Sequence, residues 1–503
     1  HTRRWRDRYW EELVAQWPFQ FHPDGMTVEQ ASYYHHFTWG FYFQLALLRR
    51  QNGLPVPQSL WDGLETALSL MTHLTRPDGR VPMIGDIDNA RSIYFYLPED
   101  QWDLRCFQAL GAVQFSRSDM KWVAGRPCEE LLWLGGEEAV ERFQALPARA
   151  PEKNSALFPH SGYLVWRSGW DQEADYLMFD FGPIAAGLHP DETPSAAHGH
   201  ADILQVEVCL QGRPLLIDPG FYTYFGPLAM HRYFRSTAGH NLVEVDGHGQ
   251  AVHENRLGWS RVVTPQLLAV AEHAPLRLAS ARITHFSRLE QVYHLRTLLW
   301  KEGAYLLVVD YLGTTERPPQ LHHLRTRWHF ASRPLRLEGE SLWAESGPVA
   351  LMAASAPGRY TLVEGQNNPP AGWMAPGYGH LQPAPMLLLE QQSTLPVLNA
   401  LLIPLRQEAS CKIQLSLQRE ADSFSLEVVA KASVDRFYFP ARQSPGVLTL
   451  PEVAVKLSPV LLAGHLNHSG GQRRWFVLSP ASEANVTGQF SWLPEPIEKS
   501  LTT

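Results

Sequence analysis

Cysteine is scarce in this chain of 503 residues, which contains four. Cys106, Cys128, Cys209 and Cys411 form no Cys-x-x-Cys pair, and their spacing does not resemble a disulfide framework. The sequence therefore argues against a small scaffold held together by disulfides, and the cysteines leave the redox compartment open.

The sequence also lacks a long apolar run, an excess of positive charge and a visible signal peptide. No apolar run reaches the length of a membrane span, so we expect no membrane-spanning helix. The net charge of -8 argues against a general nucleic-acid binder. No signal peptide is visible, but residue 1 is His and not Met, so we expect the natural amino terminus to be missing. The sequence leaves the oligomeric state open.

What is abundant is apolar and aromatic surface. Hydrophobic residues make up 45% of the chain, so sizeable cores can form, and the length predicts two or three domains. Of the 43 basic residues, 36 are Arg and 7 are Lys, and planar guanidinium groups bind carboxylates well. The 17 Trp and 17 Tyr supply stacking surfaces of the kind that sugars favour.

Residues 1–150 are predicted to be helical. The Pro23-Asp24-Gly25 turn precedes Thr27 and Gln30, whose spacing predicts a capping box and a buried helix over about 28–50. A second helix begins near Ser59 and places Leu60, Leu64, Leu68 and Met71 on one face, and a third fits about 99–116. Helices joined by such turns indicate stacked antiparallel α-hairpins.

The pattern changes near Pro151. Short alternating apolar segments separated by turn residues predict a central antiparallel β-sandwich over 151–405. A long Pro/Gly-rich loop is expected over 368–379, and a smaller β-domain over 406–503. The predicted fold class is thus a helical part followed by antiparallel β-sandwich domains.

The segment 194–250 carries the densest set of chemical groups. His198, His200, Asp202, Asp218 and His240 fall on predicted strands and strand ends, where imidazole and carboxylate ligands favour a first-row metal, above all zinc. The alternative is a set of ordinary polar groups at strand ends. Asp86 and Asp88 resemble a calcium-style acidic loop, but we favour a helix-capping turn there.

Tyrosines and arginines lie between Asp218 and His240. They are Tyr222, Tyr224, Arg232, Tyr233 and Arg235. Tyrosine can move protons and arginine binds carboxylates or sulfates, so this surface predicts enzyme chemistry on an acidic substrate. The arginines could instead pair with surface acids.

The string HGHAD…LLIDPGFYTY…RYFRSTAGHNLVEVDG resembles the heparinase II/III-like family of polysaccharide lyases. The resemblance extends to DGMTVEQASYYHH at 24–36, PDGRVPMIGDIDNAR at 77–91 and AGWMAPGYG at 371–379. It implies an α/α-toroid, incomplete here, followed by β-sandwich domains. It also implies an acidic polysaccharide substrate, which could be heparan sulfate, chondroitin, hyaluronan or alginate, and a periplasmic or secreted location. A cytoplasmic one is not excluded without the natural amino terminus.

The resemblance also implies roles for individual residues. A structural zinc would be held by His200, Asp218 and His240, with water completing the tetrahedron. His198 would face the substrate, because a bend at Gly199 sends the two imidazoles apart. The family's catalytic tyrosine matches Tyr34, with Tyr33 left open as its neighbour. The family's earlier Asn-His pair has no match in residues 1–22, as expected if the first half of the toroid is missing.

The implied reaction is β-elimination of a uronate polymer. It needs a group that neutralises the carboxylate, a base for the C5 proton and an acid for the leaving O4. We expect Tyr34 to be the acid, with a base role left open, and His198 to be its partner. Arg232 and Arg235 would bind carboxylates, and Tyr222 and Tyr224 would line the cleft.

Two other functions are consistent with the sequence. A zinc hydrolase is suggested by the likeness of HGHAD to the HxHxDH motif, but Ile203 stands where that motif needs His. A non-catalytic polysaccharide-binding protein of exopolysaccharide assembly is the second alternative.

Overall fold

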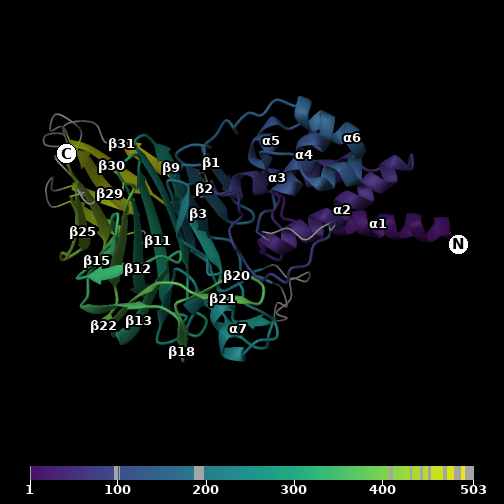
Figure 1. Ribbon diagram of the computed structural model, residues 1–503. Helices are drawn as coiled ribbons and strands as arrows, with labels where there is room; N and C mark the ends of the chain where they lie inside the picture. Colours follow the sequence, from purple (N-terminus) through teal and green to yellow (C-terminus); the bar gives the residue numbers. More distant parts are fainter. Residues whose placement is uncertain are drawn as a thin grey trace.

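The computed structural model describes residues 2–93, 95, 100, 102–185, 198–406, 412–430, 433–441, 446–450, 455–467, 473–480 and 489–492. Cys411 and residues 194–197 of the quoted segment lie outside this part. The helices of residues 2–145 form one end of the molecule and the sheets the other (Figure 1). The predicted order, a helical first part followed by antiparallel β-sandwich domains, is confirmed.

Helices precede the first strand. They are α1 (Thr2–Gln20), α2 (Ser32–Gln51), α3 (Gln58–Leu74), α4 (Arg105–Phe115), α5 (Ser118–Ala124) and α6 (Glu129–Ala145). The predicted apolar face of α3 is confirmed, since Leu60, Leu64, Leu68 and Met71 are buried. Among the helices of the described residues, none has the length and apolar character needed to cross a bilayer.

The predicted capping box at Thr27 and Gln30 is wrong. Helix α2 begins at Ser32, and Gln30 has a positive φ of 50°, which is incompatible with a helix. The Gln30 side chain accepts a hydrogen bond from Tyr163 Oη at 2.7 Å and donates to the carbonyl of Ser161 at 3.1 Å. The segment before α2 is therefore tied to the β-domain.

Four antiparallel sheets, four hairpins and the short helix α7 (Leu228–Arg235) follow in the described part of the chain. A five-stranded sheet contains β1 (Ser155–Phe158), β2 (Tyr163–Arg167), β3 (Tyr176–Asp180), β4 (Val206–Leu210) and β5 (Arg213–Leu216). An eight-stranded sheet has the order β14 (Arg336–Glu338), β15 (Ser341–Ala344), β16 (Gly347–Ala354), β23 (Val397–Pro404), β12 (Tyr305–Thr314), β11 (Val292–Lys301), β10 (Leu276–Ile283) and β9 (Pro265–His273). A four-stranded sheet has the order β17 (Gly358–Val363), β22 (Met386–Thr394), β13 (Leu321–His329) and β6 (Val243–Val245).

The carboxyl-terminal sheet has the order β24 (Ile413–Arg419), β25 (Ser423–Ala430), β26 (Ser433–Pro440), β29 (Leu462–Asn467), β30 (Arg473–Ser479) and β31 (Gln489–Trp492). Four hairpins are β7 (Val252–His253) with β8 (Trp259–Ser260), β18 (Gln366–Asn367) with β19 (Pro370–Ala371), β20 (Trp373–Gly377) with β21 (His380–Pro383), and β27 (Gly446–Leu450) with β28 (Val455–Val460). The loop predicted over 368–379 therefore contains strands.

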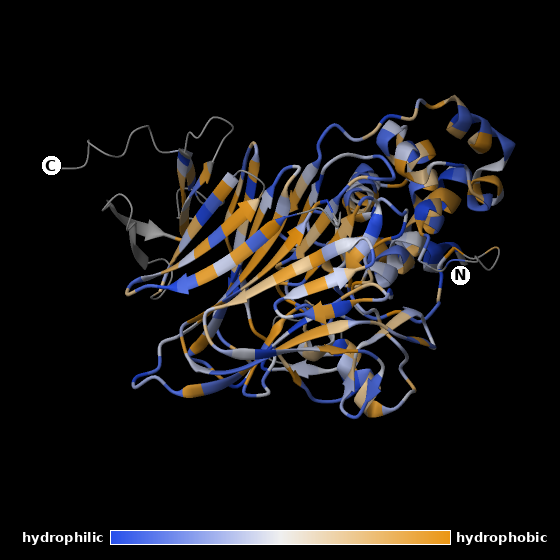
Figure 2. Ribbon diagram, turned by 60° about the vertical axis from the view of Figure 1, so that its left-hand side comes forward, coloured by the Kyte–Doolittle hydropathy of each residue, from blue (hydrophilic) through white to orange (hydrophobic). Residues whose placement is uncertain are grey.

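The central strands of the eight-stranded sheet are buried on both faces. In β12, Leu306 and Val308 pack into the core shared with the five-stranded sheet. Leu307 and Val309 point the other way, into the core shared with the carboxyl-terminal sheet. This follows from the alternation of side chains along a strand. Orange segments accordingly recur along the strands of the sandwich in Figure 2. The opposite face of the five-stranded sheet packs on the helices.

A buried cluster of Asp310, Arg296 and His294 ties this sandwich to the loops that carry the polar cluster described below. Asp310 accepts hydrogen bonds from Arg296 Nε and His294 Nε2, both at 2.7 Å. Arg296 also donates to the carbonyls of Leu204 and Asn241, at 2.6 and 2.5 Å. One guanidinium therefore fixes two loops that are far apart in sequence.

We expect Asp310→Asn to destabilise the protein by about 3–5 kcal/mol, because it leaves the Arg296 charge unpaired in the interior. Burial opposes ionisation of Asp310, but Arg296 and His294 outweigh it and hold its pKa well below the ordinary value. This contribution is thus present above about pH 4 and is lost as the pH falls further. Chemical denaturation of wild type and variant at neutral and acidic pH checks both effects, and equal stability at neutral pH would contradict the account.

Candidate active site and metal centre

The polar cluster is assembled from loops at the junction of the helices and the five-stranded sheet. Asp86 lies in the loop after α3, and its backbone N–H donates to the carbonyl of His198 at 2.9 Å. His198 and His200 precede β4, Asp218 follows β5, and His240 follows α7 (Leu228–Arg235) and a short 3₁₀ turn. Loops far apart in sequence therefore meet at one place.

Residues 198–202 form an irregular segment and not a strand. A Cβ atom at Gly199 would lie 1.5 Å from the carbonyl oxygen of Ile184, so this position admits only glycine. His200 faces the interior with no exposed surface, whereas the His198 side chain is 19% exposed. The two imidazoles thus differ in exposure, but they are not sent apart as the resemblance implied, because both contact the Asp86 carboxylate.

His200, Asp218 and His240 form a group that could hold a metal ion. His240 Nε2 lies 3.4 Å from both His200 Nδ1 and Asp218 Oδ2, and the three side chains are buried. Donor atoms around a tetrahedral ion with bonds of about 2.0–2.1 Å are separated by roughly 3.3 Å. Two of the three separations match this value, and all three donor atoms lie within 4.8 Å of one another, so the group could close around a small tetrahedral cation.

The outer nitrogens of both histidines face acceptors. His200 Nε2 lies 3.0 Å from Asp86 Oδ1, and His240 Nδ1 lies 2.8 Å from the carbonyl of Ser236. With the protons on these outer nitrogens, the two inner nitrogens face each other as lone pairs, an arrangement that a cation between them stabilises. In the absence of a metal, burial alone would lower the pKa of His240, but the Asp218 carboxylate raises it, so the position attracts positive charge.

A second cluster adjoins this group on the side of α2. The Tyr34 ring stacks on His198 with 3.7 Å between centroids and 1° between planes. Tyr34 Oη lies 3.1 Å from Tyr224 Oη, which in turn lies 2.9 Å from His198 Nδ1. Tyr224 Oη also donates to Asp86 Oδ2 at 3.1 Å. Two phenols and one imidazole thus share a connected set of hydrogen bonds.

The structure separates Tyr34 from Tyr33, which the sequence could not. Successive helix positions point about 100° apart. Tyr33 is 2% exposed and packs edge-on against Trp102, with 6.0 Å between ring centroids. Tyr33 is therefore part of the helical core, and Tyr34 is the one that reaches His198.

Both phenols in the cluster are held in the neutral form. Burial raises the pKa of Tyr34 well above its ordinary value, and the Asp88 and Asp86 carboxylates raise it further. Burial and the same Asp86 carboxylate act on Tyr224 in the same direction. Both residues are therefore proton donors and not phenolates in the free protein.

Asp86 is the residue that the sequence interpretation missed. The prediction of a capping turn is wrong for Asp86, because its side chain is fully buried and contacts His198, His200, Tyr224 and Arg235. Burial opposes its ionisation, but the Arg235 charge and the two imidazoles hold its pKa well below the ordinary value. Spacing gave no signal, since the histidines lie more than 110 residues away.

The predicted carboxylate-binding role of Arg235 conflicts with its position. Its side chain has no exposed surface, and Nε lies 3.2 Å from Asp86 Oδ1. The guanidinium also donates to backbone carbonyls, including Gly199 at 3.3 Å and Arg256. A loop that ends at Trp259 covers it, so Arg235 supports the site from within.

Arg232 and Tyr222 lie closer to solvent. Arg232 is exposed on α7, and Tyr222 is half-buried. Tyr224 receives support from the region of AGWMAPGYG, because its backbone N–H donates to Tyr378 Oη at 3.3 Å.

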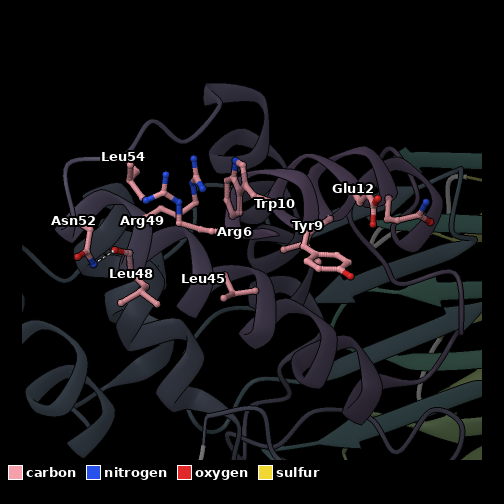
Figure 3. Close-up of a pocket in the computed structure, with 11 residues that line it drawn as sticks. Arg6, Tyr9, Trp10, Glu12, Leu45, Leu48, Arg49, Asn52 and Leu54 are labelled. Carbon is pink, nitrogen blue, oxygen red and sulfur yellow. Dashed lines mark hydrogen bonds between the residues drawn. The ribbon is translucent and has the colours of Figure 1, made fainter. Parts of the chain in front are cut away.

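A hollow of about 1010 Å³ lies elsewhere, between α1 and α2 (Figure 3). Its lining is mainly apolar or aromatic, and Arg49 stacks over Trp10 at 4.5 Å. The lining residues are Arg6, Tyr9, Trp10, Glu12, Leu13, Gln16, Leu45, Leu48, Arg49, Asn52 and Leu54. This set contains none of the residues of the Tyr34–His198 cluster.

Comparisons with known proteins identify the same family as the sequence motifs. The family model for the heparinase II/III N-terminus matches residues 1–100, and the model described as heparinase II/III-like, C-terminal, matches residues 150–417. A heparin-sulfate lyase from Pedobacter heparinus is 22% identical over 258 residues, which are 50% of this chain and 34% of that protein.

Solved structures show the same fold. Heparan sulfate lyase HepC from Pedobacter heparinus aligns with a TM-score of 0.64 and 16% identity over 88% of this chain and 63% of that one. A crystal structure of heparinase III aligns with a TM-score of 0.65 and 14% identity, over 85% and 62%. The chain thus spans about a third of the curated lyase and about three fifths of these structures.

Proposed function

Because the chain belongs to the heparinase II/III-like family, we propose that it is a polysaccharide lyase that cleaves a uronic-acid-containing polysaccharide by β-elimination. The observation that carries the proposal is the Tyr34–His198 pair, backed by Tyr224 and Asp86. The substrate would be a glycosaminoglycan such as heparan sulfate, hyaluronan or chondroitin, or alginate. We further place the protein in the periplasm or outside the cell.

Tyr34 would act as the general acid. The pKa of Tyr34 is raised by burial and by nearby carboxylates, so the residue enters the reaction with its proton. Elimination leaves negative charge on the glycosidic oxygen O4, which departs as the anomeric oxygen of the other sugar, and a neutral phenol can protonate that oxygen. A base role for Tyr34 would first require loss of this proton, which the same surroundings oppose.

His198 would act as the general base. Its Nδ1 is occupied by Tyr224 Oη and Asp86 Oδ2, at 2.9 and 3.2 Å. Its other ring nitrogen, Nε2, lies on the side of Glu29, 4.0 Å from Oε1. With a proton on Nδ1, Nε2 offers a lone pair that can take the C5 proton of a uronate.

Arg232 would neutralise a substrate carboxylate, and Tyr222 and Tyr224 would line the cleft. We expect Arg232→Ala to raise KM about tenfold, with less change in kcat, because one charge-assisted hydrogen bond is lost. Initial rates over a range of polymer concentrations measure this effect. Arg359→Ala, which removes an exposed arginine of β17, is the matched control. Equal KM values for the two variants would remove Arg232 from the substrate-binding surface.

We infer that the metal is Zn²⁺, held by His200, Asp218 and His240, with a structural role. Bound there, it would tie together the loops that carry His198 and Tyr224. The proton transfers would remain with Tyr34 and His198.

The test of the function is the ultraviolet absorbance of the unsaturated uronate product. Purified protein is incubated separately with heparan sulfate, chondroitin, hyaluronan and alginate. A rise with any polymer, absent in His198→Ala, supports the lyase and identifies the substrate class. Binding of a polymer without any fragments would favour the non-catalytic alternative, and saturated fragments would favour the zinc hydrolase.

A further inference from the structure

The Asp86 carboxylate joins the metal group to the Tyr34–His198 cluster. Its Oδ1 lies 3.0 Å from His200 Nε2 and 3.2 Å from Arg235 Nε. Its Oδ2 lies 3.2 Å from His198 Nδ1 and accepts from Tyr224 Oη at 3.1 Å. Each oxygen atom thus contacts a different histidine.

We propose that Asp86 is a positioning residue that fixes the tautomers of both His198 and His200. The His198 half of this inference rests on the proposed function, and the His200 half does not. An ionised carboxylate accepts hydrogen bonds and donates none, so each imidazole must direct an N–H toward it.

For His200, this places the proton on Nε2. Nδ1 then carries a lone pair directed at His240 Nε2, 3.4 Å away, and toward Asp218. A carboxylate behind a histidine ligand raises the basicity of the ligating nitrogen and fixes the orientation of the ring. The consequence is a preformed metal ligand.

For His198, the proton is on Nδ1 and the lone pair on Nε2. The ring is held between the stacked Tyr34 and the Asp86–Tyr224 pair. The same carboxylate therefore leaves a lone pair on His200 Nδ1 for a metal and a lone pair on His198 Nε2 for a proton of the substrate.

The buried Arg235 is what allows the charge on Asp86. Neither side chain has exposed surface, and Arg235 Nε lies 3.2 Å from Asp86 Oδ1, so each buried charge compensates the other. The position of Arg235 inside the protein is thus explained by Asp86.

Asp86→Asn tests the inference, because Asn has nearly the same shape but presents an N–H where one oxygen stood. We expect kcat to fall about 100-fold with KM changed less than about threefold, since substrate contacts remain. Competition for Zn²⁺ with a chromophoric chelator should show affinity weakened about 10–100-fold. In ¹⁵N-histidine spectra, the Nδ1–H signal of His198, identified by its loss in His198→Gln, should weaken.

Two further variants complete the experiment. Asp86→Asn combined with Arg235→Met removes both buried charges, so it reports on positioning if the single variant is too unstable. Asp435→Asn is the control, because Asp435 is an equally buried carboxylate that accepts from Lys301 and Tyr305 in another part of the fold. Asp435→Asn should lower stability and leave kcat, Zn²⁺ affinity and the His198 signal unchanged.

Wild-type Zn²⁺ affinity and an unchanged His198 signal in Asp86→Asn would overturn the inference. A wild-type protein that binds no Zn²⁺ would overturn its His200 half. If no polymer is cleaved, the proposed function fails by itself, whereas Zn²⁺ affinity and the nitrogen spectra still decide the role of Asp86.

Discussion

Tyr34→Phe is expected to lower kcat for polymer cleavage by about 10²–10⁴-fold, the range contributed by a positioned general acid. The substitution removes one oxygen atom and keeps the ring that stacks on His198 at 3.7 Å. Substrate binding and the position of His198 should therefore change little, and KM should stay within about threefold. The measurement is the rate of unsaturated product formation at saturating polymer.

Tyr33→Phe is the matched control for this experiment. It makes the same chemical change one position earlier in α2, on a side chain that packs against Trp102 in the helical core. We expect nearly wild-type kcat from this variant. Comparable losses in both variants would point to damage to α2, and wild-type rates in Tyr34→Phe would exclude Tyr34 as the acid.

Removal of the metal is expected to have the second large effect. A site saturated at 100–1,000 times its dissociation constant stabilises the folded state by about 2.7–4.1 kcal/mol. For a domain of the size of the β-sandwich over 151–405, this stabilisation corresponds to a fall in Tm of about 5–15 °C when a chelator is added. His240→Ala should show the low Tm from the start and no further response to the chelator, because it removes the central ligand.

His322→Ala is the control for the metal experiment. His322 is another buried histidine and lies on β13. Its Nδ1 is 2.7 Å from Asp246 Oδ2, and its Nε2 is 3.0 Å from Glu316 Oε2. This variant should keep the full response to the chelator. Because the metal is proposed to be structural, Co²⁺ should restore both Tm and activity to the stripped protein. An unchanged Tm of wild type in chelator would contradict a structural metal.

The sequence predicted those parts of the site whose residues belong to recognisable motifs. The group of His200, Asp218 and His240 was predicted from residue types and family motifs, and the structure brings the three together. Strand alternation likewise predicted the sandwich, because one face of a strand must be apolar to form a core. The layering on both sides of the eight-stranded sheet needed the structure.

The sequence did not predict the role of a residue when that role depends on a partner far away in the chain. Asp86 was interpreted as a turn residue because it stands in the short acidic string GDID, while its partners lie on other loops. Arg232 and Arg235 are three positions apart on one short helix, so periodicity alone gives them similar directions. The loop that ends at Trp259 covers only Arg235 and makes it an internal group.

Gln30 illustrates the same limit on the fold. The spacing of Thr27 and Gln30 satisfied a local rule, and a hydrogen bond to Tyr163, 133 residues away, overrode it. Tertiary contacts of this kind also place Tyr34 against His198. The resemblance implied that the two residues are partners, and the face-to-face stacking of their rings is seen only in the structure.

The most direct test of β-elimination at this cluster is the fate of solvent oxygen during cleavage. Polymer is digested in water labelled with heavy oxygen, and the new chain ends are examined by mass spectrometry. Elimination breaks the C4–O4 bond without adding water, so the account predicts unsaturated ends with no label. Saturated non-reducing ends, with the labelled oxygen on the reducing ends made by the same cuts, would show hydrolysis and contradict the roles proposed for Tyr34 and His198.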